Sequence, residues 1–135
     1  MEYTEYLRAI KEADALIDGG HLKDAEAALY KLIFSEISDV DRATLCVRMA
    51  GVYDKMGNTD DALEWYNKAI AAEQPLCRFE AAEKKAQYLS WLGHNPDAVA
   101  ICEELLKQPY LSEGDKDHVR QLIKAFLSKT LGEWR

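Results

Sequence analysis

The sequence predicts an all-α fold made of stacked helix pairs, with about seven helices in 135 residues. Apolar side chains recur at intervals of three and four residues along most of the chain, which is the spacing of one helix face. No sustained stretch alternates β-branched and polar residues, as a half-buried strand would. A short joint that begins with glycine occurs three times, at Gly20, Gly57 and Gly93, with spacings of 37 and 36 residues. This recurrence indicates a repeated helix–turn–helix unit.

The first helix pair is expected on either side of Gly19 and Gly20. A helix over residues 2–18 ends there because glycine readily adopts the left-handed conformation that terminates helices. A second helix follows over residues 23–35. The apolar faces consist of Tyr3, Tyr6, Leu7, Ile10, Ala13, Leu16 and Ile17 in the first helix, and Ala25, Ala28, Leu29, Leu32 and Ile33 in the second.

The second pair is expected to comprise helices over residues 39–56 and 60–73. Short polar side chains that can accept from free amide groups precede both helices, Ser38 or Asp39 in one case and Thr59 or Asp60 in the other. Trp65 and Tyr66 are adjacent, so they cannot share a helix face. Because Tyr66 lies on the apolar face, we expect Trp65 to point outward and to be half-exposed.

Prolines mark the third pair and the boundary before the last helix. Pro75 and Pro96 each suit the first turn of a helix, where no amide hydrogen is needed. Pro109 ends the sixth helix because its ring prevents continuation, and Ser112 is expected to cap the seventh helix. The expected ranges are 75–92, 96–107 and 113–131.

The three joints share more than their glycine. An aspartate follows the glycine by four residues and an alanine by five, at Asp24-Ala25, Asp61-Ala62 and Asp97-Ala98. An aspartate in the first helical turn suits the helix dipole. The alanine lets two antiparallel helices approach closely.

This pattern resembles the tetratricopeptide repeat family. The residues of the middle repeat that agree with the family's signature are Met49, Ala50, Tyr53, Gly57, Ala62, Tyr66 and Ala69. The first and third repeats depart from it, because Ala9 and Ala82 replace a bulky aromatic residue. The resemblance implies a right-handed α-α superhelix, a helical-repeat solenoid, in one domain over residues 1–135. Its repeats are expected over about 3–36, 39–73 and 75–108, and its capping helix over about 112–132.

The resemblance also implies a concave groove in which a partner's peptide or helical segment docks. The groove positions carried over from the family are Ile10, Asp14 and Ile17, then Val47, Arg48 and Asp54, then Glu83, Lys84, Gln87 and Trp91. Family members that bind a chaperone's terminal carboxylate use Lys, Asn and Arg. Here Ile10, Asp14 and Glu80 stand at three of those positions, so a carboxylate ligand would be repelled and is not expected.

Some groove residues have two interpretations from the sequence alone. Leu7, Ile10 and Ile17 either line the groove or pack against the second helix. Trp91 either anchors a partner or covers the seventh helix. Gly51 lies inside a helix, where glycine costs about 1 kcal/mol relative to alanine. It indicates close approach of a neighbouring helix or, alternatively, of a ligand.

The charge balance restricts the partner. The net charge is −7, and residues 1–77 carry all of the excess, with 8 basic and 15 acidic side chains, whereas residues 78–135 have 9 of each. Repulsion from phosphate groups disfavours nucleic acid and anionic membranes, so a basic or apolar protein segment is the expected partner. A run of about 18 apolar residues and a signal-peptide pattern are both missing from the sequence, which indicates a soluble, cytoplasmic protein.

Catalytic, metal and cofactor sites are not expected. Cys46 and Cys102 lie on apolar helix faces and are predicted to be core residues. The cysteine spacings match no zinc site. None of the three histidines has a cysteine or a second histidine at helical spacing, and no phosphate-binding loop or nucleophile motif is present.

The leading hypothesis is therefore a non-enzymatic protein-interaction module. One alternative is a homodimer formed through the seventh helix or exposed end faces, suggested by the apolar residues Val119, Leu122, Phe126 and Leu127 with Trp134 near the end. Another is a small chaperone for a secreted effector.

Overall fold

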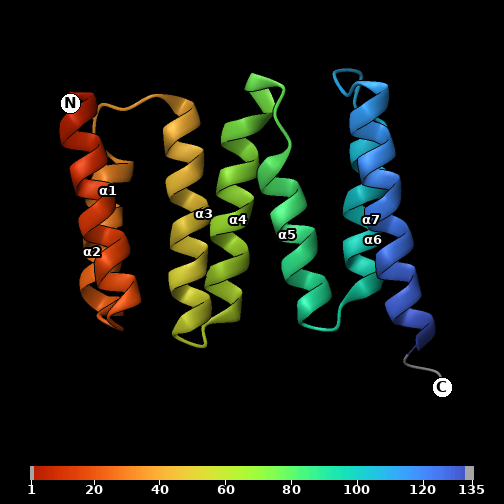
Figure 1. Ribbon diagram of the computed structural model, residues 1–135, viewed down its shortest axis with the longest axis horizontal. Helices are drawn as coiled ribbons and strands as arrows, with labels where there is room; N and C mark the ends of the chain where they lie inside the picture. The colour runs from red at the N-terminus through yellow and green to blue at the C-terminus, as the bar shows by residue number, and fades with distance from the viewer. Residues whose placement is uncertain (1, 133–135) are drawn as a thin grey trace. The chain divides into compact units, whose positions relative to one another are not determined.

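The computed structural model describes the backbone of residues 2–132 and the side chains of residues 2–129 (Figure 1). Within that range it contains seven α-helices, one 3₁₀ turn and no strand. The helices are α1 (Tyr3–Asp18), α2 (Leu22–Ile33), α3 (Asp39–Lys55), α4 (Thr59–Glu73), α5 (Glu80–Trp91), α6 (Asn95–Leu106) and α7 (Glu113–Gly132). The all-α prediction is confirmed, and only α5 departs from its expected bounds by more than two residues.

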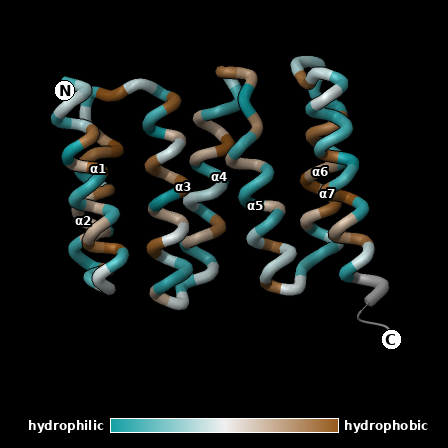
Figure 2. Tube along the Cα trace, in the orientation of Figure 1, coloured by the Kyte–Doolittle hydropathy of each residue, from teal (hydrophilic) through white to brown (hydrophobic). Residues whose placement is uncertain are grey.

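The chain divides into two compact units, Met1–Leu76 and Cys77–Arg135. In the N-terminal unit α1 packs on α2, α2 on α3 and α3 on α4; in the C-terminal unit α6 packs on both α5 and α7. Figure 2 shows hydrophobic and hydrophilic residues interspersed along each helix, as amphipathic helices require. Superhelical stacking and a single domain over the whole chain stay predictions.

Both cores combine large side chains with alanines at the joints. Leu29, Leu45, Met49 and Val52 are fully buried in the N-terminal unit, and Val119 is fully buried in the C-terminal unit. Each such side chain contributes about 1.5–3 kcal/mol by leaving water. The joint alanines Ala25, Ala62 and Ala98 are all 0% exposed, as close helix approach requires.

The predicted core cysteines are confirmed. Cys46 and Cys102 are both buried free thiols, whereas Cys77 is exposed. Burial raises the pKa of both buried thiols, that of Cys102 to about 11. Both therefore stay protonated at neutral pH and behave as small apolar side chains.

The three glycine joints have the same backbone structure. Gly20, Gly57 and Gly93 have φ angles of +78°, +79° and +89°. In each joint the residue after glycine donates its amide to a carbonyl five residues back, as His21 does to Leu16 at 2.8 Å. The glycine itself donates to a carbonyl three residues back. This pair of bonds is the Schellman motif, which satisfies the last carbonyls of a helix and needs a left-handed residue.

Two predicted N-caps are confirmed and one is wrong. Asp41 donates its amide to Ser38 Oγ at 3.1 Å, and Asp115 donates its amide to Ser112 Oγ at the same distance. Helix α4 is capped by Asn58 instead of Thr59 or Asp60, because the chain is already helical at Thr59.

The prediction that Pro75 opens the fifth helix is wrong. Pro75 lies in a 3₁₀ turn, Gln74–Leu76, that continues directly from the end of α4. Cys77 then adopts φ +57°, which interrupts the helical path, and α5 begins only at Glu80. Pro75 therefore marks the end of one helix instead of the first turn of the next.

The expected half-exposure of Trp65 is also wrong, because the side chain is only 7% exposed. Its ring meets Tyr30 of α2 edge-on, with 6.3 Å between centroids, and Lys68 Nζ lies 4.2 Å from the ring centroid. Trp65 is thus covered by a side chain from α2 and by a neighbour on its own helix.

Candidate partner-binding site

The structure brings together two of the predicted groove residues, one from α1 and one from α3. Arg48 Nε donates to Asp14 Oδ1 at 3.1 Å, and both side chains are partly exposed. A pair this accessible contributes about 0–1 kcal/mol. It is the contact that places Asp14 of α1 beside Arg48 of α3, and it balances their two charges.

Apolar side chains on α1 are only partly covered. Tyr3 is 68% exposed and Leu7 is 45% exposed, whereas Ile10 and Ile17 are half-buried. Leu7 is thus not a core residue, and Ile10 and Ile17 are shared between the core and the surface. Their spacing places Tyr3, Leu7, Ile10 and Asp14 along one side of the helix.

Helix α3 has open space at one of its own positions, Gly51. Val47 and Asp54 are half-buried, as is Gly51 one turn beyond Val47. A Cβ built on Gly51 meets no atom within 4 Å. The expectation that a neighbouring helix explains this glycine by close packing is therefore wrong.

The predicted site residues of α5 lie in the C-terminal unit. Lys84, Gln87 and Trp91 are exposed and share one side of α5, and Trp91 is 75% exposed, so α7 does not cover it. Glu83 is instead half-buried, and its carboxylate contacts Nε2 of His118 in α7. Lys84, Gln87 and Trp91 are therefore accessible to a partner, whereas Glu83 makes contacts within the C-terminal unit.

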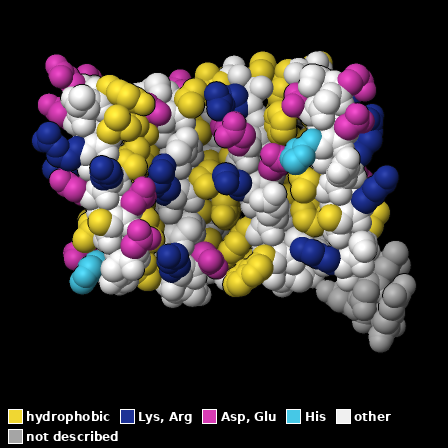
Figure 3. Space-filling view, viewed as in Figure 1, with side chains coloured by type: hydrophobic (Ala, Val, Ile, Leu, Met, Phe, Trp, Pro, Cys, Tyr) yellow, Lys and Arg dark blue, Asp and Glu magenta, His cyan; other side chains and the backbone are white. Residues whose placement is uncertain are grey.

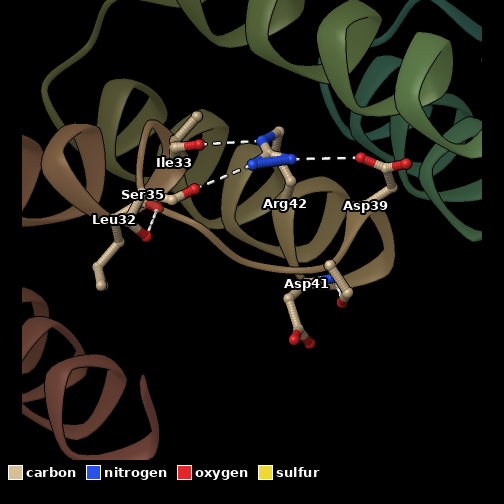
Figure 4. Close-up of polar contacts among 7 residues, drawn as sticks. Leu32, Ile33, Ser35, Asp39, Asp41 and Arg42 are labelled. Atoms are coloured by element: carbon tan, nitrogen blue, oxygen red, sulfur yellow. Dashed lines mark hydrogen bonds and ion pairs between the residues drawn. The ribbon is translucent and has the colours of Figure 1, made fainter. Parts of the chain in front are cut away.

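The loop between α2 and α3 contains a polar cluster that the sequence did not indicate (Figure 4). Arg42 donates from Nε to the carbonyl of Ile33 at 3.0 Å and from Nη2 to that of Ser35 at 3.1 Å. Its Nη1 also pairs with Asp39 at 3.3 Å. The Ile33 carbonyl is the last of α2, where helices lack internal donors, and the Ser35 carbonyl lies in the loop that follows. Arg42 thus fixes the loop that connects the first two pairs.

Tyr6 and Asp41 link α1 to the first turn of α3 at the same end of the unit. Tyr6 is 5% exposed. Burial, and then the charge and hydrogen bonding of the Asp41 carboxylate, raise the pKa of Tyr6 to about 12. No short motif marks these contacts, because each joins residues from different helices.

Most of the apolar residues proposed for a homodimer are buried or half-buried inside the C-terminal unit. Val119 is 0% exposed and Phe126 is 3% exposed; Leu122 is half-buried and Leu127 is 47% exposed. Trp134 lies outside the described residues. Among the residues of α7 with described side chains, Leu127 is the large apolar one left exposed.

The described part of the chain holds no group of three or more His, Cys, Asp and Glu side chains placed to hold a metal ion. None of its helices is long and apolar enough to cross a membrane. No family model matches the chain, and no curated protein matches it.

Proposed function

We propose that this chain is a non-enzymatic protein-interaction module of the tetratricopeptide type, and that the α1–α3 face binds a segment of a partner protein. Three Schellman joints with the same glycine and buried alanine support the repeat assignment. The proposal includes stacking of the pairs over about 3–36, 39–73 and 75–108 into a right-handed superhelix, with residues 112–132 as the cap.

The observation that carries the binding proposal is the open space at Gly51. A mid-helix glycine costs about 1 kcal/mol relative to alanine, and no packing in the structure requires it. Exposed Leu7 on α1 and half-buried Val47 on α3 lie on the two helices of this face. A partner segment that lies against the α3 backbone accounts for both the missing side chain and the uncovered apolar surface.

The charges favour a basic or apolar partner segment. Arg48 is already paired with Asp14, so it offers little positive charge to a ligand. The N-terminal unit has 8 basic and 15 acidic side chains. An acidic segment would be repelled by this excess, whereas a basic one would be attracted at low ionic strength.

The test begins with selection of binding peptides from a displayed random library, with the full chain as bait. The selected peptide is then titrated against wild type, Gly51→Gln and the matched control Ala27→Gln. Glutamine at position 51 fills the open space and has a better helix propensity than glycine, so loss of folding does not confound the result. Ala27 is exposed on α2, which is neither of the two helices of the proposed face.

We expect Gly51→Gln to weaken binding by about tenfold or more, which is about 1.4 kcal/mol, and Ala27→Gln to bind as wild type does. Equal affinity of Gly51→Gln and wild type would show that the peptide binds another surface.

A further inference from the structure

An open cleft of about 530 Å³ lies at one end of the N-terminal unit. Its walls come from the first turns of α1 and α3 and from the loop over residues 35–38. The side chains that matter are those of Tyr3, Tyr6, Glu36, Ile37, Asp41 and Arg42. A cleft with aromatic, aliphatic and charged walls suits a side chain that has both an apolar stem and a charged end.

Two tyrosines form the aromatic wall. The rings of Tyr3 and Tyr6 are stacked, with centroids 6.3 Å apart and an angle of 28° between their planes. Tyr6 is buried and fixed beside Asp41, whereas Tyr3 is 68% exposed. A cation over the face of a tyrosine ring is attracted by the ring's π electrons.

The charges in the cleft are unequally available. Arg42 is engaged with two backbone carbonyls and with Asp39. The Ser38 hydroxyl already accepts the Asp41 amide at the start of α3. An anion would therefore find few free donors there. Asp41 and Glu36 also line the cleft, and although the Asp41 carboxylate hydrogen-bonds with Tyr6, a carboxylate has further acceptor positions for a visiting donor.

The side chains around the cleft also favour a positively charged ligand. Figure 3 shows acidic side chains around the hydrophobic ones at the N-terminal end of α1, and the basic group nearest the cleft is Arg42 in its own lining, which is already paired with Asp39. A positive group approaching this end is attracted, and a phosphate or carboxylate is repelled.

We propose that this cleft binds an arginine side chain of the partner. The planar guanidinium stacks on Tyr3, donates to the Asp41 carboxylate and is attracted by Glu36. The identity of the molecule that carries the arginine rests on the proposed function; the chemistry of the cleft does not.

The probe is N-acetyl-arginine amide, titrated into the ¹⁵N-labelled full chain and followed by NMR chemical shifts. N-acetyl-citrulline amide, which has nearly the same shape without the charge, is the matched probe. We expect saturable shifts at residues 36–41 and around Tyr3 with the arginine probe, and about tenfold weaker binding of citrulline. Equal binding of the two probes, or shifts scattered over the acidic surface, would overturn the proposal.

Substitutions in the cleft lining test which side chains bind the arginine probe. Tyr3→Ala and Glu36→Gln each change a side chain outside the core, and we expect each to weaken the arginine probe by about threefold to fivefold. Tyr30→Ala and Glu12→Gln make the same changes at exposed positions elsewhere in the unit, and should leave the affinity unchanged. Unchanged affinity of both cleft variants would overturn the proposal without any question of folding.

Failure here is distinguishable from failure of the proposed function. If library selection gives no binder but the arginine probe saturates the cleft, the cleft proposal stands and the α1–α3 face proposal falls. If binding of a selected peptide requires Gly51 but the citrulline probe binds as tightly as the arginine probe, the α1–α3 face proposal stands and the cleft proposal falls.

Discussion

The two units differ in how they use charged side chains. In the N-terminal unit arginines join one element to another, Arg48 from α3 to α1 and Arg42 from α3 to the end of α2. In the C-terminal unit the pairs Arg120–Asp117 and Lys107–Glu104 each lie within three residues along the chain. The contacts between α7 and α5 there come from a histidine and a lysine instead, His118 with Glu83 and Lys129 with Ser90. The N-terminal unit thus commits basic groups to its fold and presents an acidic exterior, whereas the other unit is charge-balanced. Only the N-terminal unit therefore carries a net charge that can attract a partner of opposite charge.

The largest effect should come from the cores, and it tests whether the units open independently. Leu29→Ala in the N-terminal unit should cost about 2–5 kcal/mol, and Phe126→Ala in the C-terminal unit about 3–5 kcal/mol, because each leaves a cavity. Both side chains are at most 3% exposed. Native-state hydrogen exchange should show faster opening of amides in the substituted unit. Equal loss of protection in both units for either variant would indicate a single cooperative domain.

The next largest loss of stability should come from an arginine that joins two elements, compared with an arginine that pairs within its own helix. Arg42→Met removes a charged donor from two backbone carbonyls and should destabilise the N-terminal unit by about 2 kcal/mol. Arg120→Met removes only a pair on its own helix with Asp117 and should cost less than about 0.5 kcal/mol. Urea unfolding of both variants measures the difference. Equal losses would contradict the distinction between joining and local pairs.

Alkaline pH should weaken the N-terminal unit through Tyr6. Burial and Asp41 raise the pKa of Tyr6 to about 12 from the ordinary 10.0. The unfolded chain therefore loses this proton first, so the contribution of Tyr6 to stability is complete below pH 10 and disappears as the pH rises through 12. Urea midpoints across this range should fall less steeply for Tyr6→Phe than for wild type. Tyr30→Phe, at a 52% exposed position, is the control and should follow wild type.

What could be predicted from the sequence is what depends on neighbouring residues. The glycine joints, the Ser38 and Ser112 caps and the burial of Cys46 follow from local chemistry and helical spacing. Pro75 fits the end of one helix as well as the first turn of another, and only the left-handed Cys77 decides between them. Trp65 and Arg42 are placed by contacts with other helices, which no spacing along one helix reveals. The same reason hid the cleft, whose walls come from two helices and a loop.

The smallest effect separates stability from binding, and it uses one glycine from each unit. Gly51 of α3 has open space at its Cβ, and at Gly114 of α7 the nearest atom is Ser112 Oγ at 3.8 Å. Neither has a positive φ angle. Alanine should therefore stabilise the chain by about 0.5–1 kcal/mol at position 51, and by less in the first turn of α7.

The selected peptide should bind Gly51→Ala more weakly than wild type, despite the gain in stability, and should not distinguish Gly114→Ala from wild type. Such a result would mean that alanine at position 51 favours stability whereas glycine favours binding. The glycine would then be explained by a partner that approaches the α3 backbone at this position. Tighter or equal binding by Gly51→Ala would remove that reason, and with it the observation on which the α1–α3 face proposal depends.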